Sequence, residues 1–240
     1  MPNQLILLPG WAFGPAALQP LCEALSELAP DLEVVIEPLP ELADAGAWLE
    51  ELDRRLPHDS WLGGWSLGGM LATQLAARRV DTCGGLITIA ANPCFRARPQ
   101  WPEAMATDIF DAFHEAFRLD PEETLKRFRL LCSRGGYDPR TLARQLEVSQ
   151  STSSPAVLDA GLQLLAELDG RGALHGYFGP QLHLFAGNDA LVPAAASDAL
   201  RRWMPGIEAE LLTGASHALP LERPDDVASM IWAFIKGKVI

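Results

Sequence analysis

A serine stands inside the pentad Gly64-Trp65-Ser66-Leu67-Gly68, between an apolar run that ends at residue 63 and a helix-like stretch over residues 70–77. A strand, a sharp turn and a helix around a G-x-S-x-G match are typical of a turn that exposes a nucleophilic serine. Glycines suit the flanking positions because the serine is strained there and the helix start packs closely on the strand. The pattern predicts that Ser66 is a nucleophile.

A serine nucleophile needs a base, and the base needs an acid that orients it. Asp189 follows an apolar run over residues 181–187, and His217 follows a second strand candidate over residues 208–212. Because loops after parallel strands meet at one rim of a sheet, Ser66, Asp189 and His217 are expected to come together. An Asp before a turn is, alternatively, a helix cap or a solvated residue. The other histidines are expected to be structural or surface residues: His58, His114, His175 and His183.

Acyl transfer also needs hydrogen-bond donors for an oxyanion. The first candidate is the backbone N–H of Leu67, which follows the serine and begins a helix. The second is the amide of Trp11, in the loop after a strand candidate over residues 5–8, where Gly10 lets the chain turn inward. The indole of Trp11 would line the acyl pocket, with ordinary core packing as the alternative.

Motifs over almost the whole chain resemble those of one known family. They cover residues 7–11, 61–69, 91–95 with 101–102, 189–193 and 214–218. They are similar to the α/β-hydrolases of the pimeloyl-ACP methyl ester esterase family, the BioH-type carboxylesterases of biotin synthesis. In that fold the catalytic residues follow one another along the chain in the order Ser, Asp, His, as the three candidates do here. One position departs from the pattern: family members usually carry His-Gly before the tryptophan, and this chain has Pro9-Gly10.

The resemblance implies a serine carboxylesterase without a cofactor, which hydrolyses the methyl ester of pimeloyl-ACP to pimeloyl-ACP and methanol. It implies that Ser66, Asp189 and His217 are catalytic. It also implies a lid helix whose residues form an acyl-chain wall: Phe128, Arg129, Leu130, Leu131 and Cys132. Docking of acyl carrier protein is implied for lid arginines that match the family's: Arg127, Arg140 and Arg144. A fourth family arginine aligns with Glu123.

Alternating strand and helix patterns predict an α/β fold with a mostly parallel six-stranded sheet and helices on both faces. The expected strands lie near residues 4–8, 33–37, 60–64, 85–90, 181–186 and 208–212, with 33–37 at one edge. Residues 94–176 break the alternation. Asp-Pro and Ser-Pro helix starts there predict a four-helix lid over residues 102–118, 121–133, 139–150 and 155–168. Residues 1–93 and 177–240 form the expected hydrolase core.

Charge is distributed unevenly along the chain. There are 19 Lys and Arg residues against 31 Asp and Glu residues, a net charge of −12, which argues against nucleic acid or an anionic membrane as a partner. Residues 118–144 nevertheless carry seven basic side chains against four acidic ones, a local charge of +3. This patch suits docking of a small acidic protein, and a merely solvated helix surface is the alternative.

Length and composition bound the remaining possibilities. With 240 residues, 48% of them hydrophobic, the chain can bury one large core. No apolar run approaches about 18 residues, and the first residues enter a strand without a signal-peptide pattern. Four scattered cysteines indicate neither a metal site nor a disulfide scaffold. We expect an unsecreted, cytoplasmic monomer.

Two alternative functions stay open. The first is a general short-chain carboxylesterase. The second and more distant one is a non-catalytic binding protein on this fold, because binding alone does not require all three catalytic groups.

Overall fold

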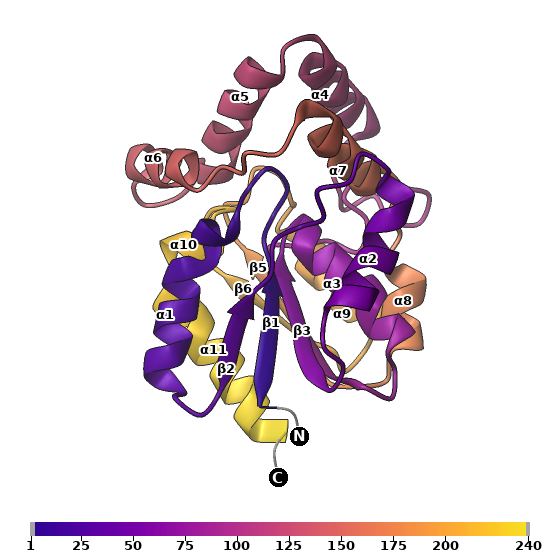
Figure 1. Cartoon of the computed structure of the whole chain (residues 1–240), viewed down its shortest axis with the longest axis vertical. Helices are drawn as coiled ribbons and strands as arrows, with labels where there is room; N and C mark the ends of the chain where they lie inside the picture. Colours follow the sequence, from indigo (N-terminus) through magenta and orange to yellow (C-terminus); the bar gives the residue numbers. More distant parts are fainter. Residues whose placement is uncertain (1–2, 239–240) are drawn as a thin grey trace.

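A six-stranded sheet with helices on both faces forms the body of the computed structural model, which describes residues 3–238 (Figure 1). All strand pairs are parallel, in the order β2-β1-β3-β4-β5-β6. The expected α/β fold is confirmed, with β2 at one edge. The first two and last two residues of the expected hydrolase core lie outside the described residues. The strands are β1 (Gln4–Leu8), β2 (Glu33–Ile36), β3 (Ser60–Trp65), β4 (Cys83–Ile89), β5 (Gln181–Ala186) and β6 (Glu208–Leu212).

Helices cover both faces of this sheet (Figure 1). On one face lie α1 (Gln19–Leu28), preceded by the 3-10 turn η1 (Pro15–Leu18), and α11 (Pro224–Lys238). The other face carries η2 (Ala45–Ala47), α2 (Trp48–Arg55), α3 (Leu67–Arg78), α8 (Arg171–Gly176) and α9 (Ala195–Trp203). The sequence did not predict α8 or α10 (Leu219–Glu222), because helices of six and four residues are too short to show a hydrophobic period. Within residues 3–238, none of the helices has the length and apolar character needed to cross a bilayer.

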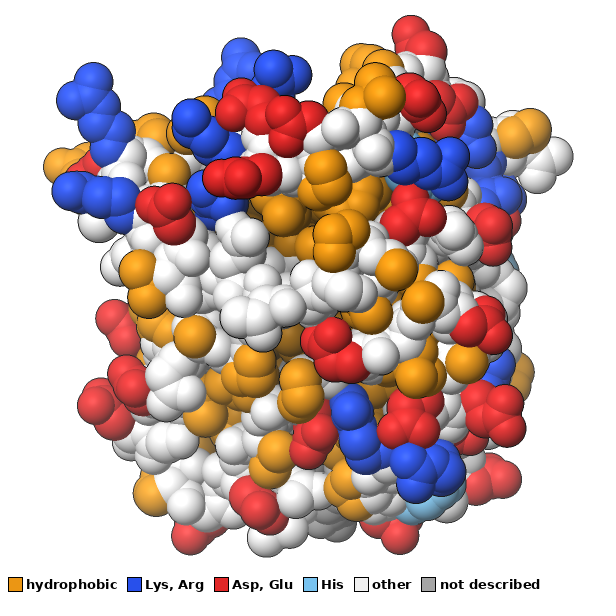
Figure 2. Space-filling view, turned by 45° about the horizontal axis from the view of Figure 1, so that its top comes forward, with side chains coloured by type: hydrophobic (Ala, Val, Ile, Leu, Met, Phe, Trp, Pro, Cys, Tyr) orange, Lys and Arg blue, Asp and Glu red, His pale blue; other side chains and the backbone are white. Residues whose placement is uncertain are grey.

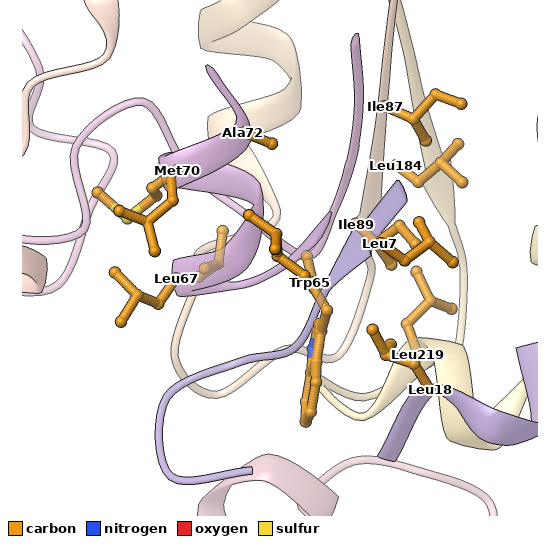
Figure 3. Packing of buried hydrophobic residues seen from close by; sticks show 14 of the residues in the cluster. Leu7, Leu18, Trp65, Leu67, Met70, Ala72, Ile87, Ile89, Leu184 and Leu219 are labelled. Carbon is orange, nitrogen blue, oxygen red and sulfur yellow. The ribbon is translucent and has the colours of Figure 1, made fainter. Parts of the chain in front are cut away.

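The four inner strands are mostly apolar and buried, because helices cover both faces of the sheet, whereas the edge strands β2 and β6 carry exposed glutamates. Gly63 in β3 allows close packing of β1 and β4 against it, because a Cβ at this position would lie 3.0 Å from both Leu7 Cδ2 and the Ile87 carbonyl oxygen. Figure 3 shows Trp65 between α3, which contributes Leu67 and Met70, and a group of leucines that includes Leu7. This packing sets the position of the turn between β3 and α3.

Four of the helices between β4 and β5 lie over the carboxyl ends of the strands (Figure 1). They are α4 (Thr107–Leu119), α5 (Pro121–Ser133), α6 (Pro139–Val148) and α7 (Pro155–Glu167). Asp120, Asp138 and Ser154 cap the last three by accepting backbone N–H groups, which explains the Asp-Pro and Ser-Pro signals. Helix α4 begins five residues later than predicted. The preceding segment folds on itself instead, with a backbone hydrogen bond of 2.8 Å from Ala97 to Met105.

Candidate active site

Ser66 lies in the sharp turn between β3 and α3. Its φ of 55° and ψ of −120° are a conformation that residues with a side chain seldom adopt. The turn needs its glycines, because a Cβ on Gly64 would lie 2.3 Å from the carbonyl carbon of Gly68, and one on Gly68 would lie 2.2 Å from the Leu8 oxygen. The Ser66 N–H donates to the Ile89 carbonyl at 2.9 Å, which joins the strained turn to β4.

The structure brings together the three side chains that the sequence placed in separate loops. Ser66 Oγ lies 3.0 Å from His217 Nε2, and His217 Nδ1 lies 2.7 Å from Asp189 Oδ2. The other oxygen of Asp189 accepts the N–H groups of Leu191 and Val192 at 2.8 and 2.9 Å. Because an ionised carboxylate only accepts, Nδ1 carries the proton toward Asp189 and Nε2 is left to accept from the serine hydroxyl. The arrangement can remove a proton from Ser66.

This site is closed off from solvent. The side chains of His217 and Asp189 are 0% exposed, and Ser66 as a whole is 5% exposed. Electrostatic interactions are stronger in such a low-dielectric environment than in water.

The two backbone amides predicted to bind an oxyanion belong to segments that lie next to Ser66. Leu67 is the first residue of α3, so its N–H has no acceptor within the helix. The loop that carries Trp11 passes close to the serine, because a Cβ on Gly10 would lie 3.4 Å from Ser66 Cβ. The Trp11 indole N–H donates to the Leu158 carbonyl oxygen at 2.8 Å. The indole also packs edge-on against the Phe128 ring, with the ring centroids 4.8 Å apart. Its side chain therefore joins the loop after β1 to the lid.

The expected acyl-chain wall in α5 is divided between several faces of that helix. Phe128 and Leu131 line an apolar cavity of about 50 Å³ beside Trp11. Arg129 instead bonds to Gln150 and pairs with Glu147 at 3.3 Å. Leu130 points outward and is 56% exposed, and Cys132 is buried near Asp189, where burial first and the Asp189 charge second raise the pKa of its thiol. Five consecutive residues cannot share one wall, because each helical residue is rotated by about 100° from the last.

The three matched lid arginines lie on the surface. Arg127 pairs with Glu123 at 3.2 Å across one helical turn, and its side chain is 66% exposed. Arg140 is exposed in the first turn of α6, and Arg144 bonds to Thr141 Oγ1 at 3.2 Å. Figure 2 shows Lys and Arg side chains gathered over the α5–α6 end of the lid, with acidic side chains among them. None of the three contacts the Ser66 site among the described residues.

The remaining histidines lie apart from Ser66. His183 is buried in β5, with Nδ1 2.7 Å from Thr88 Oγ1, and burial lowers its pKa to about 3. His114 pairs with Asp159 within the lid at 2.7 Å. His58 contacts Thr82, and the His175 ring packs against Trp203.

No role was predicted from the sequence for two residues near His217, Ser216 and Glu222. Ser216 is fully buried, and Glu222 accepts hydrogen bonds from it. An acidic residue five positions after the histidine was the available signal, but on its own it does not distinguish a site residue from a helix-surface residue.

Comparisons with known proteins show the family and the fold of this chain. A model of the "Alpha/beta hydrolase family" matches residues 5–230. The chain is 34% identical to a "Pimeloyl-[acyl-carrier protein] methyl ester esterase" of Aromatoleum aromaticum, over 97% of this chain and 98% of that protein. It is 37% identical to the "Biotin biosynthesis bifunctional protein BioHC" of Cellvibrio japonicus, over 96% of this chain but 47% of the relative, so it spans about half the length of such bifunctional relatives. A bromoperoxidase from Bacillus anthracis has a similar fold, with a TM-score of 0.83 and 17% identity over 98% of this chain and 92% of that one.

Proposed function

This chain belongs to the alpha/beta hydrolase family and, within it, to the family of pimeloyl-[acyl-carrier protein] methyl ester esterases, and on that premise we propose that it is a serine carboxylesterase. Its proposed reaction is hydrolysis of the methyl ester of pimeloyl-ACP to pimeloyl-ACP and methanol in biotin synthesis. The observation that carries the proposal is the chain of contacts from Ser66 Oγ through His217 to Asp189, at 3.0 and 2.7 Å.

In the proposed mechanism Ser66 Oγ attacks the ester carbonyl while His217 Nε2 takes its proton. The amides of Trp11 and Leu67 stabilise the oxyanion that forms. His217 then returns the proton to the methoxy oxygen, the carbon–oxygen bond breaks and methanol leaves. Water attacks the acyl-enzyme with His217 again as base, which restores Ser66 and releases the carboxylate. Asp189 holds the imidazole in the required tautomer throughout.

The cavity under the lid supports an acyl substrate with a methylene chain. Its lining is wholly apolar and comes largely from the lid, including Ile109, Phe113 and Phe128. At about 50 Å³ it has room for only a few water molecules, so a seven-carbon chain requires the lid to open further. The lid would thereby select for chain length and exclude water around the reacting ester.

The surface of α5 and α6 supports an acidic carrier as the partner. Arg127, Arg140 and Arg144 are exposed, within a segment of local charge +3 on a chain of net charge −12. Electrostatic attraction to this patch would orient the carrier with its acyl group toward the lid. The four free cysteines support a reducing compartment, and we propose that the protein is cytoplasmic. We also propose that it is a monomer.

One observation favours a general short-chain carboxylesterase as a second candidate. Glu123, at the position where the family resemblance implies an arginine, pairs with Arg127 and Lys126 and so competes with a carrier for those charges. Carrier docking would then be weaker than the local charge suggests, while the Ser66 site would still hydrolyse small esters.

Two measurements on the purified protein test the proposal. We expect kcat/KM for carrier-bound pimeloyl methyl ester to exceed that for 4-nitrophenyl butyrate, and Ser66→Ala to lower both by about 10⁴-fold or more. The gene should also restore growth of a biotin-requiring strain that lacks its own esterase, and the Ser66→Ala gene should not. A preference for the small ester together with failed rescue would favour the general esterase.

A further inference from the structure

One carboxylate beside the site is held through both of its oxygens. Glu222 ends α10, five residues after His217, and its Oε2 accepts both the N–H and the hydroxyl of Ser216 at 2.7 Å. Its Oε1 accepts the N–H of Tyr137 at 2.8 Å. Tyr137 belongs to the lid, in the connection between α5 and α6, so a single side chain joins the lid to the loop of the histidine.

On the core side, Glu222 fixes the position of Ser216, the residue that precedes His217. Ser216 is fully buried, and Glu222 satisfies both of its hydrogen-bond donors. Without the carboxylate these buried donors would lose their acceptor, which is costly enough for the loop to rearrange. His217 is the next residue, so a rearrangement at Ser216 displaces the imidazole relative to Ser66.

On the lid side, the contact is part of a larger junction. We call residues 132–137 the lid turn. Its Cys132 carbonyl accepts the N–H of Ala218 at 3.1 Å, and its Gly135 carbonyl accepts the side-chain amide of Asn188 at 2.9 Å. These contacts reach the residue after His217 and the residue before Asp189. The lid turn is therefore bonded to both loops that orient the proposed base.

Glycines let the lid turn approach this closely. A Cβ on Gly136 would lie 2.9 Å from Glu222 Oε1 and 2.7 Å from Leu142. Gly135 has a φ of +88°, and a Cβ there would lie 2.5 Å from the Asn188 carbonyl oxygen. The junction is thus built into the backbone and does not depend on Glu222 alone to bring the surfaces together.

We propose that Glu222 is a positioning residue that couples the position of the lid turn to the orientation of His217. The proposal rests on the esterase function proposed above, because His217 is the base of that reaction. Glu222 does not touch the reacting atoms. While the lid turn holds Glu222 through the Tyr137 N–H, Glu222 holds Ser216 in place. When the lid turn is displaced, Glu222 and Ser216 are held less firmly, and the imidazole of His217 is less well aligned with Ser66.

The test compares Glu222→Ala and Glu222→Gln with Asp225→Asn, which removes one negative charge from an exposed position three residues away. Glutamine has the size of glutamate but cannot accept from both Ser216 and Tyr137 through two oxygens. Labelling with a fluorophosphonate counts the activated serines, so kcat for 4-nitrophenyl butyrate can be given per active site. We expect both Glu222 variants to lose about 10- to 100-fold in kcat per labelled site with little change in KM, and Asp225→Asn to match wild type.

A spectroscopic readout separates this proposal from the esterase function. The His217 Nδ1 proton, bonded to Asp189 at 2.7 Å, should give a downfield NMR resonance, assigned by its loss in His217→Ala. We expect the resonance to shift or broaden in both Glu222 variants and in Gly136→Ala, whose added Cβ would lie 2.9 Å from Glu222 Oε1 and so displaces the lid turn without removing the carboxylate. If the wild-type protein shows the resonance but hydrolyses no ester, the esterase proposal is contradicted. The effect of the Glu222 variants on the His217 resonance can still be measured in that case.

Wild-type kcat per labelled site and an unchanged resonance in Glu222→Gln would overturn the proposal, even if Glu222→Ala fails to fold. A lower melting temperature with both readouts unchanged would show that Glu222 only stabilises the protein. An unchanged resonance in folded Gly136→Ala would overturn the coupling to the lid.

Discussion

Trp65 donates its indole N–H to the carbonyl oxygen of His217 at 2.8 Å. The residue that precedes the strained serine therefore also holds the residue that contacts the serine hydroxyl. The indole is fully buried and stacks on Phe13 at 4.9 Å, so its orientation is set by packing. Strand β3 thus positions Ser66 through the backbone and His217 through a side chain.

Removing this donor tests the relationship. Trp65→Phe keeps an aromatic ring against Phe13 but leaves the buried His217 carbonyl without its partner, which costs about 1–3 kcal/mol of stability. We expect a lower melting temperature and a kcat for a small ester reduced by about tenfold or more, because the imidazole is less well held. Thermal unfolding and steady-state kinetics measure both effects. An unchanged kcat in a destabilised variant would show that the contact matters only for folding.

A second prediction concerns the acid. Asp189→Asn should keep the fold, because its side-chain oxygen can still accept from Leu191 and Val192. Ester hydrolysis should fall by about 10³- to 10⁴-fold, because an amide facing Nδ1 favours the wrong histidine tautomer. Asp198→Asn is the control, since Asp198 pairs with Arg201 and its side chain is 69% exposed. If the Asp198 variant proves the more damaged, the acid has been misplaced.

Charge reversal on the lid tests carrier docking. The double variant Arg127→Glu with Arg140→Glu should raise KM for the carrier-bound ester, because encounter and docking depend on those charges. Hydrolysis of 4-nitrophenyl butyrate should hardly change, and wild-type turnover of the carrier substrate should fall with rising salt, given a Debye length of about 10 Å at 0.1 M. Arg54→Glu with Arg78→Glu, at exposed positions on α2 and α3, makes the same change in net charge away from the lid. Equal losses on both substrates would mean that the lid arginines support folding of the lid.

The last prediction concerns stability against acid. Burial lowers the pKa of His183 to about 3, below the value of about 6.5 expected in the unfolded chain. Between these values the unfolded state binds more protons, so the free energy of unfolding falls as pH falls below about 6.5, by up to about 3 kcal/mol at pH 4. We expect a shallower decline between pH 6.5 and 4 in His183→Gln, whose side chain does not titrate. Denaturant unfolding of both proteins across this range measures the difference, and parallel stability curves would contradict it.

Local patterns in the sequence determined the strands, the turn around Ser66 and the starts of three lid helices. Each depends on residues close in the chain: the glycines on either side of Ser66, the alternation of apolar and polar segments, and Asp-Pro pairs such as Asp120-Pro121. The chain order also placed Asp189 and His217 in loops after strands. A parallel sheet collects such loops at one edge, so this part of the site could be anticipated without knowing any distance.

Only the tertiary structure decided which neighbours those residues have. Phe128 lines the cavity while Arg129 turns away, because helix packing selects one face of α5. Glu222 meets Tyr137 across 85 positions of sequence, and Trp65 meets His217 across 152. Contacts over such separations follow from how the lid and the sheet pack together, and no local pattern records them. The residues around Ser66 could therefore be read from the chain, whereas the contacts that hold the imidazole and join it to the lid required the folded molecule.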